Sequence, residues 1–99
     1  MTALETKRLA RLLAEPARLE ILSRIGRAEE YACADLVAAL ALTPATVSHH
    51  MKELIESGLV EDRREGKFHF YRVNRARWNA YLAGLARLVP VSEKNPNLR

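Results

Sequence analysis

Four side chains of this 99-residue sequence carry the nitrogen or sulfur atoms that transition metals prefer: Cys33, His49, His50 and His69. A tetrahedral zinc site needs four protein ligands, or three with one open position. His49 and His50 are adjacent in a segment that we expect to be helical, and adjacent helical side chains point about 100° apart. We therefore do not expect these two to chelate one ion, and the sequence predicts no metal site within one chain.

The short motifs that carry common enzyme chemistry are also absent from the sequence. It has no glycine-rich phosphate loop, no G-x-S-x-G turn and no H-E-x-x-H helix. Most acidic residues stand beside Lys or Arg on expected helical faces, as they do on a solvated surface. We therefore expect neither an enzyme nor a bound cofactor.

A polar set in the middle of the chain favours nucleic-acid recognition. Thr43-Pro44 has the form of a helix N-cap followed by proline at the first helical position, and Gly58 is placed to end that helix. The side of the helix away from the core is small and polar, as entry into a major groove requires, although a merely solvated face fits equally well. The candidate DNA contacts of this segment are Thr43, Thr46, Ser48, His49 and Lys52.

A second candidate DNA contact follows this helix. Residues 67–73 alternate apolar and polar side chains, and Glu65-Gly66 is typical of a hairpin turn. Arg63, Arg64 and Lys67 flank that turn, where cations suit a phosphate backbone or a minor groove. The same cations also protect an exposed strand edge from aggregation, and Glu61, Asp62 and Glu65 dilute the charge.

The elements that must position these residues are predominantly helical. Apolar periodicity predicts helices on both sides of Glu15-Pro16, another over about 33–40, the Thr43–Ser57 helix, and a last one over about 75–88 that Pro90 stops. We expect a connector over residues 27–32. Two short helices joined by a tight turn and followed by a basic hairpin form a winged helix-turn-helix. We assign residues 1–91 to this one domain and residues 92–99 to a loose tail.

Bulk composition sets broad limits on the kind of protein. The net charge of +4 is mildly basic, which is compatible with a polyanionic partner. One cysteine excludes an intramolecular disulfide and favours a reducing compartment. No apolar run approaches the roughly 20 residues of a membrane span, and no signal peptide is visible, so we expect a cytoplasmic protein without membrane contact.

Three stretches carry a family resemblance that covers about two-thirds of the chain. They are LLAEPARLEIL at residues 12–22, TVSHHMKEL at 46–54, and GLV at 58–60 followed by REGK at 64–67 and Tyr71. Together they resemble the opening, recognition helix and wing of the ArsR/SmtB family of bacterial winged-helix repressors. The resemblance implies repression by binding an imperfect palindromic operator and blocking polymerase. By match to the family's recognition helix, Thr46, Ser48 and His49 would contact DNA, whereas periodicity places His50 inward as a structural residue.

The resemblance also implies a homodimer joined by the first and last helices. Apolar stripes on these helices agree with that expectation, because one small domain could not easily cover them. The candidate interface residues are Leu4, Leu12, Trp78, Tyr81, Leu82 and Leu85.

The sequence departs from the family at its two familiar metal sites. The segment that resembles the family's C-x-C-D-L motif is Ala32-Cys33-Ala34-Asp35-Leu36, so both motif cysteines are alanine. Residues 74–91 contain no Asp, His, Glu or Cys to form the second site. The effector therefore stays unknown: a small organic molecule, a thiol or metalloid response through Cys33, or no effector fits the sequence. Cys33 near a helix N-terminus would favour a thiolate, while free cysteines commonly behave as small buried hydrophobes.

The main rival function is a winged helix that serves protein–protein contact without DNA. Such a surface should expose aromatic or aliphatic side chains on the recognition helix, and the outer face described above has none. Salt dependence distinguishes the two, because phosphate contacts weaken steeply with salt and an apolar interface does not.

Overall fold

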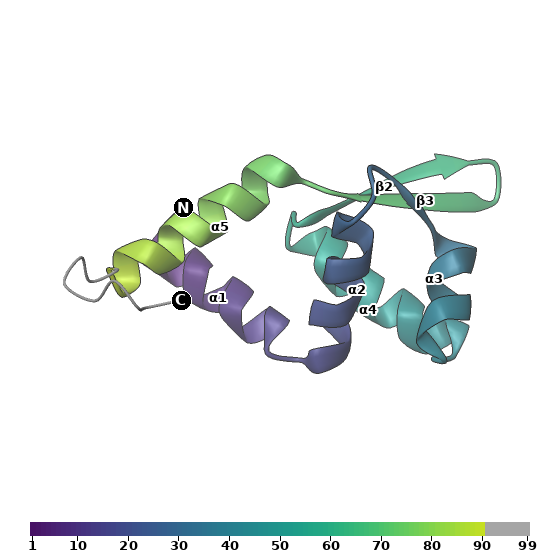
Figure 1. Ribbon diagram of the computed structural model, residues 1–99, viewed down its shortest axis with the longest axis horizontal. Helices are drawn as coiled ribbons and strands as arrows, with labels where there is room; N and C mark the ends of the chain where they lie inside the picture. Colours follow the sequence, from purple (N-terminus) through teal and green to yellow (C-terminus); the bar gives the residue numbers. More distant parts are fainter. Residues whose placement is uncertain (91–99) are drawn as a thin grey trace.

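The structure is a computed structural model that describes residues 1–90, so the tail expected at 92–99 lies outside the described residues. The fold is the expected winged helix-turn-helix, mainly helical with a small antiparallel sheet (Figure 1). The elements in chain order are α1 (Ala3–Leu13), α2 (Pro16–Gly26), β1 (Tyr31–Ala32), α3 (Cys33–Leu40), α4 (Pro44–Glu56), β2 (Val60–Glu65), β3 (Phe68–Val73) and α5 (Arg75–Leu88).

Local signals at the helix ends explain most of these bounds. Thr2 and Glu5 form a reciprocal capping box at the start of α1. Pro16 and Pro44 occupy the first turns of α2 and α4, where a missing N–H is harmless. Ala41 takes the left-handed conformation (φ 52°) that ends α3 and turns the chain toward α4. The tight turn expected at this point is confirmed.

The sheet has one strand more than the sequence indicated. Its order is β1-β3-β2, and β1 lies within the segment 27–32 that we expected to be only a connector. Tyr31 pairs with Tyr71 and Ala32 with Phe70. That expectation was wrong because two residues are too few to produce an alternating pattern. The hairpin between β2 and β3 turns at Gly66-Lys67, one residue later than expected, since Glu65 still pairs with Phe68.

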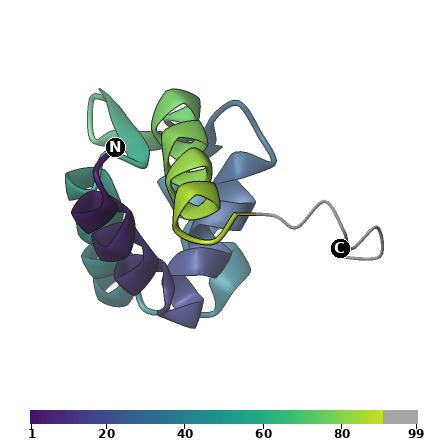
Figure 2. The ribbon, with the colours of Figure 1, turned by 90° about the vertical axis from the view of Figure 1, so that its left-hand side faces the viewer.

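The core lies between the helices and the sheet. Buried apolar side chains of α2, α3 and α4 meet those at the base of the hairpin, whereas α1 and α5 form the other end of the molecule (Figure 1). Figure 2 views that end and shows α1 and α5 side by side. The fully buried side chains include Ile21, Ile25, Leu36, Val47, Met51, Leu54, Leu59 and Val60.

The contact between α1 and α5 depends on one glycine. Gly84 is buried on α5 and faces Thr6, a polar residue of α1 that is also buried. A Cβ at position 84 would overlap the Thr6 hydroxyl and lie 3.3 Å from both Thr6 Cβ and Cγ2. The Thr6 hydroxyl is held in place because it donates to the Thr2 carbonyl at 3.0 Å. Gly84 therefore sets how closely the two helices approach.

We expect Gly84→Ala to lower the free energy of unfolding by about 1–3 kcal/mol through overpacking. Helix propensity alone would give the opposite sign, because alanine favours a helix over glycine by about 1 kcal/mol. Urea denaturation measures the difference. The double variant Thr6→Ala/Gly84→Ala should recover most of the loss. A Gly84→Ala variant as stable as the parent would show that α1 and α5 are not in close contact here.

Candidate nucleic-acid interface

Helix α4 is fixed at its start by side-chain hydroxyls. The Thr43 hydroxyl oxygen accepts a hydrogen bond from the Thr46 N–H at 3.2 Å, and the two threonine hydroxyls lie 2.8 Å apart. Val47, Met51 and Leu54 are buried along the opposite side of the helix. The cap and the buried stripe together determine which face of α4 is left toward solvent.

The outward face of α4 carries the predicted residues. Ser48, His49 and Lys52 are exposed, and so is the Thr43 cap, while Thr46 is half-buried at the edge. His50 is half-buried, and its Nδ1 is enclosed without a hydrogen-bond partner in the described part of the chain. This face is free of large apolar side chains, so a polar surface can approach it closely.

Strand pairing sorts the wing cations onto two faces. Arg64 pairs with His69 and Arg63 pairs with Phe70, and side chains alternate between faces along a strand. Arg63 thus lies on the opposite face from the buried Tyr71, and its guanidinium there is already bound to carboxylates. Its guanidinium donates to both Glu30 oxygens at 2.6 and 2.9 Å and to Glu65 at 3.2 Å.

Charge and aromatic contacts both hold Arg63 in this position. Its guanidinium carbon lies 4.6 Å from the centre of the Phe70 ring. The hydrogen bond to Glu30 raises the pKa of Arg63 most, and the hydrogen bond to Glu65 raises it further. The contact between Arg63 and Glu30 also lowers the pKa of Glu30. The three predicted wing residues are therefore not equivalent.

Arg64 and Lys67 are the wing cations that remain available. Both are exposed, and neither forms an ion pair within residues 1–90. Lys67 Nζ lies 5.8 Å from the centre of the Phe68 ring, which is itself exposed at the tip of the hairpin. These two side chains can reach a phosphate without first breaking an ion pair.

The inner face of the wing lies against α4. Ser48 and Lys52 of α4 share a hollow of about 400 Å³ with Asp62, His69 and Tyr71 of the hairpin. His69 Nδ1 lies 3.0 Å from both Asp62 carboxylate oxygens, which fixes the ring. His69 is an additional candidate contact that the sequence offered only as a metal ligand. The alternation of side chains along the hairpin strands, which places His69 beside Arg64, could have indicated this role in the sequence.

Cys33 borders the same hollow from the first turn of α3. It is half-buried and packs against the apolar core. Its neighbour Tyr71 is buried. This burial is the main cause that raises the pKa of Tyr71, and a hydrogen bond with Cys33 raises it further. Cys33 is thus neither a fully enclosed core residue nor a free surface thiol. In residues 1–90 no three His, Cys, Asp or Glu side chains gather as a metal site would require.

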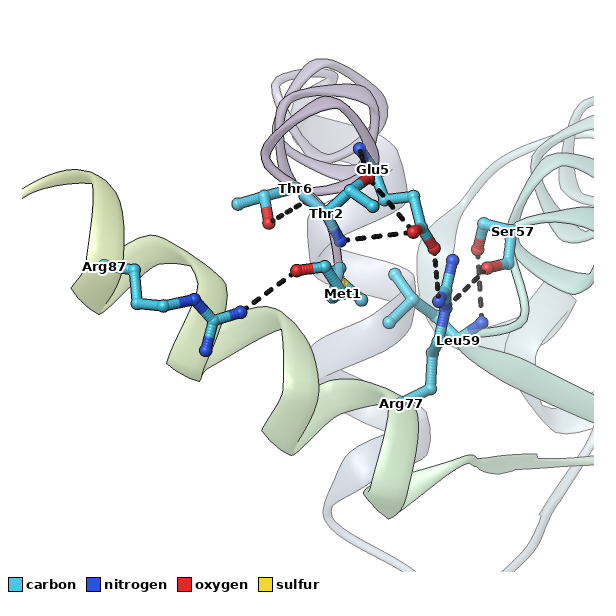
Figure 3. Close-up of polar contacts among 8 residues, drawn as sticks. All are labelled: Met1, Thr2, Glu5, Thr6, Ser57, Leu59, Arg77 and Arg87. Atoms are coloured by element: carbon cyan, nitrogen blue, oxygen red, sulfur yellow. Dashed lines mark hydrogen bonds and ion pairs between the residues drawn. The ribbon is translucent and has the colours of Figure 1, made fainter.

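Arg77 fixes the far end of α4 to the other helices (Figure 3). From α5, its Nε donates to the Ser57 carbonyl at 3.2 Å, and Nη1 donates to Glu5 of α1 at 3.2 Å. Its side chain also lies against Gly58, which takes a positive φ of 83°. No local pattern in the sequence indicates this role, because Ser57 and Glu5 are both distant from Arg77 along the chain.

The predicted dimer residues fall into two groups. Leu4, Leu82 and Leu85 are exposed, at 57%, 45% and 37% of their surface. Leu12 and Trp78 are half-buried against the core, and Tyr81 is buried within the single chain. Leu88, the last residue of α5, and Val89, which follows it, are exposed apolar residues as well. Among the described residues, no helix has the length and apolar character to cross a membrane.

Comparison with known proteins gives matches over the same elements. Residues 13–63, from the end of α1 into β2, match a family described as "Helix-turn-helix domain". The chain is 37% identical over 76 residues to the arsenical resistance operon repressor of Staphylococcus aureus. The aligned residues cover 77% of this chain and 72% of that protein.

Two solved structures resemble the whole fold. An ArsR-like transcriptional regulator from Rhodococcus sp. RHA1 has a TM-score of 0.74 and 28% identity, covering 85% of this chain and 78% of its own. The homodimeric winged helix-turn-helix DNA-binding domain of a possible ArsR-family regulator from Mycobacterium bovis has a TM-score of 0.65 and 28% identity, covering 85% and 82%.

The Glu5 contacts make stability depend on pH. Hydrogen bonds from the Thr2 backbone and then from Arg77 hold the pKa of Glu5 below its ordinary 4.5. A carboxylate whose pKa is lowered by folding stabilises the protein above its unfolded-state pKa, and this contribution is lost as pH falls through the folded-state pKa. We expect Glu5→Gln to be less stable than the parent at pH 7, with the difference shrinking below pH 4.5.

Urea denaturation of both proteins across this pH range tests the expectation. Glu29→Gln is the matched control, since Glu29 is exposed and forms no ion pair within residues 1–90. A difference between parent and Glu5→Gln that stays constant with pH would mean that the ionised carboxylate does not contribute.

Proposed function

Because this chain belongs to the ArsR/SmtB family of winged helix-turn-helix transcriptional regulators, we propose that it represses transcription as a homodimer on a palindromic operator. The observation that carries the proposal is the arrangement of α4 and the wing. An exposed polar helix face lies beside a hairpin that carries two cations without ion pairs among the described residues. A regulator of this kind acts where the DNA is, in the bacterial cytoplasm.

Roles for individual residues follow from their positions. Ser48 and His49 would read base edges from the first turns of α4, with Thr43 and Thr46 close to the phosphates at the positive end of the helix. Lys52, Arg64 and Lys67 would bind the backbone. Arg63 would act indirectly, because its contacts with Glu30 and Glu65 hold the wing in shape.

A homodimer accounts for the apolar end of the molecule. Leu4, Leu82, Leu85, Leu88 and Val89 leave an apolar surface on α1 and α5 at the end shown in Figure 2. Exposed patches of this kind mark interaction surfaces. The structurally similar Mycobacterium bovis domain is itself homodimeric. A two-fold axis through this end would present two α4 helices to the DNA, which suits a palindrome.

The principal test is a fluorescence-anisotropy titration of the protein, shown to be dimeric by sedimentation, against its own upstream promoter duplex. A random duplex of equal length runs beside it, at about 50 mM and about 200 mM salt. We expect tight, promoter-selective binding that weakens steeply with salt. Folded dimer without selective binding at either salt would contradict the proposal and favour a protein-interaction module.

The wing should contribute to affinity through charge alone. Arg64→Ala and Lys67→Ala should weaken binding to both duplexes and reduce the slope of log K against log salt by about 0.9 for each contacting protomer. Arg63→Ala is the matched control, because its guanidinium is already paired with Glu30. An unchanged slope in Arg64→Ala or Lys67→Ala would remove that residue from the interface. A slope reduced equally by Arg63→Ala would show that the ion pair opens on DNA.

Helix α4 should contribute discrimination. Ser48→Ala and His49→Ala should each weaken promoter binding by about 1–3 kcal/mol for each lost base contact, with little change on random DNA. The comparison is with Arg64→Ala, which should affect both duplexes alike. Equal losses on promoter and random DNA in the α4 variants would mean that these side chains touch phosphates and do not read bases.

A further inference from the structure

An apolar pocket lies outside the DNA-binding face, where α2, the end of β3 and the start of α5 meet. Its volume is about 290 Å³, just below the roughly 300–1,000 Å³ that is typical of ligand pockets. Leu22, Val73 and Trp78 form much of its wall. None of the proposed DNA contacts lines this pocket.

Two guanidinium groups border this otherwise apolar pocket. Arg75 donates to the Gly26 carbonyl at 2.7 Å, and Arg27 donates to the Ser23 hydroxyl at 3.1 Å. Both acceptor groups are uncharged, and within residues 1–90 neither arginine forms an ion pair. A guanidinium has five N–H donors, so each keeps donors for a carboxylate. An apolar wall with a cationic rim matches a small molecule that has an apolar body and one carboxylate.

The pocket touches the parts that an effector must move. Val73 is the last residue of the wing strand, and Trp78 lies one turn into α5, the expected dimer helix. We propose that this pocket is the effector site and that it binds a small apolar carboxylate whose occupation changes affinity for DNA. The effector role rests on the proposed DNA-binding function, whereas the binding itself does not.

Gly26 offers a way to fill the pocket without disturbing the fold. A Cβ at this position would lie 3.7 Å from Val73 Cγ2 and 3.8 Å from Arg75 Nη1, both ordinary contacts. Gly26→Leu should therefore extend into the pocket. Gly26→Ala is the matched control, because it also replaces glycine with a residue that has a Cβ but fills little of the pocket.

Trp78 reports directly on the pocket, because it is the single tryptophan of the chain. Octanoate is the probe, and octanol is its uncharged counterpart. We expect octanoate to change Trp78 fluorescence saturably, and octanol to bind at least about tenfold more weakly. Gly26→Leu should abolish the change and Gly26→Ala should retain it. Arg27→Gln/Arg75→Gln should raise the octanoate Kd about tenfold or more, unlike the exposed Arg11→Gln.

No saturable change with octanoate, or equal binding by parent and Gly26→Leu, would overturn the site. A second titration measures promoter affinity with and without saturating octanoate. A shift in the parent that Gly26→Leu lacks supports the effector role, and an unshifted affinity with octanoate bound overturns it. Absence of promoter binding without octanoate would instead contradict the proposed function. The fluorescence titration would still test whether the pocket binds octanoate.

Discussion

One-sided burial of α4 is the constraint on which the rest of the structure depends. Val47, Met51 and Leu54 are almost completely removed from water, so the helix cannot rotate without exposing them. The opposite face is thereby presented to solvent in a fixed orientation. Thr43 fixes the start of the helix through its cap, and Arg77 fixes its end through the Ser57 carbonyl. A recognition surface of small polar residues gains its precision from this apolar stripe, since its own side chains have little to hold them.

How far the sequence predicted this arrangement depends on the range of each interaction. The helices, the Thr43-Pro44 start and the polar face of α4 were predictable, because capping and periodicity act within a few residues. Strand β1 was missed, since its two residues are ordered by Tyr71 and Phe70, far along the chain. The same reason hides Arg77, whose partners lie in α1 and at the end of α4. The sequence alone does not show that Arg63 and Arg64 lie on opposite faces of the wing, because this depends on how β2 pairs with β3.

The wing illustrates why a count of cations misjudges a surface. Arg63, Arg64 and Lys67 are close in sequence and all exposed, but their surroundings differ. Glu30 enters from the loop before β1 and holds Arg63, so the two charges largely compensate each other. Alternation along β2 then turns Arg64 to the other face, beside His69. Of the acidic residues close to the wing cations in sequence, Glu65 reaches Arg63, whereas Glu61 pairs with Arg72 and Asp62 with His69.

The connection between wing and dimer helix determines how a signal could travel. A single residue, Asn74, separates β3 from α5, and it is fixed on both sides. Its N–H donates to the Leu59 carbonyl at 2.9 Å, and its side chain caps α5 by accepting from the Arg77 N–H at 3.0 Å. Arg77 in turn holds the end of α4. A rotation of α5 would therefore move the wing and the far end of α4 together, because no flexible segment lies between them to absorb the motion.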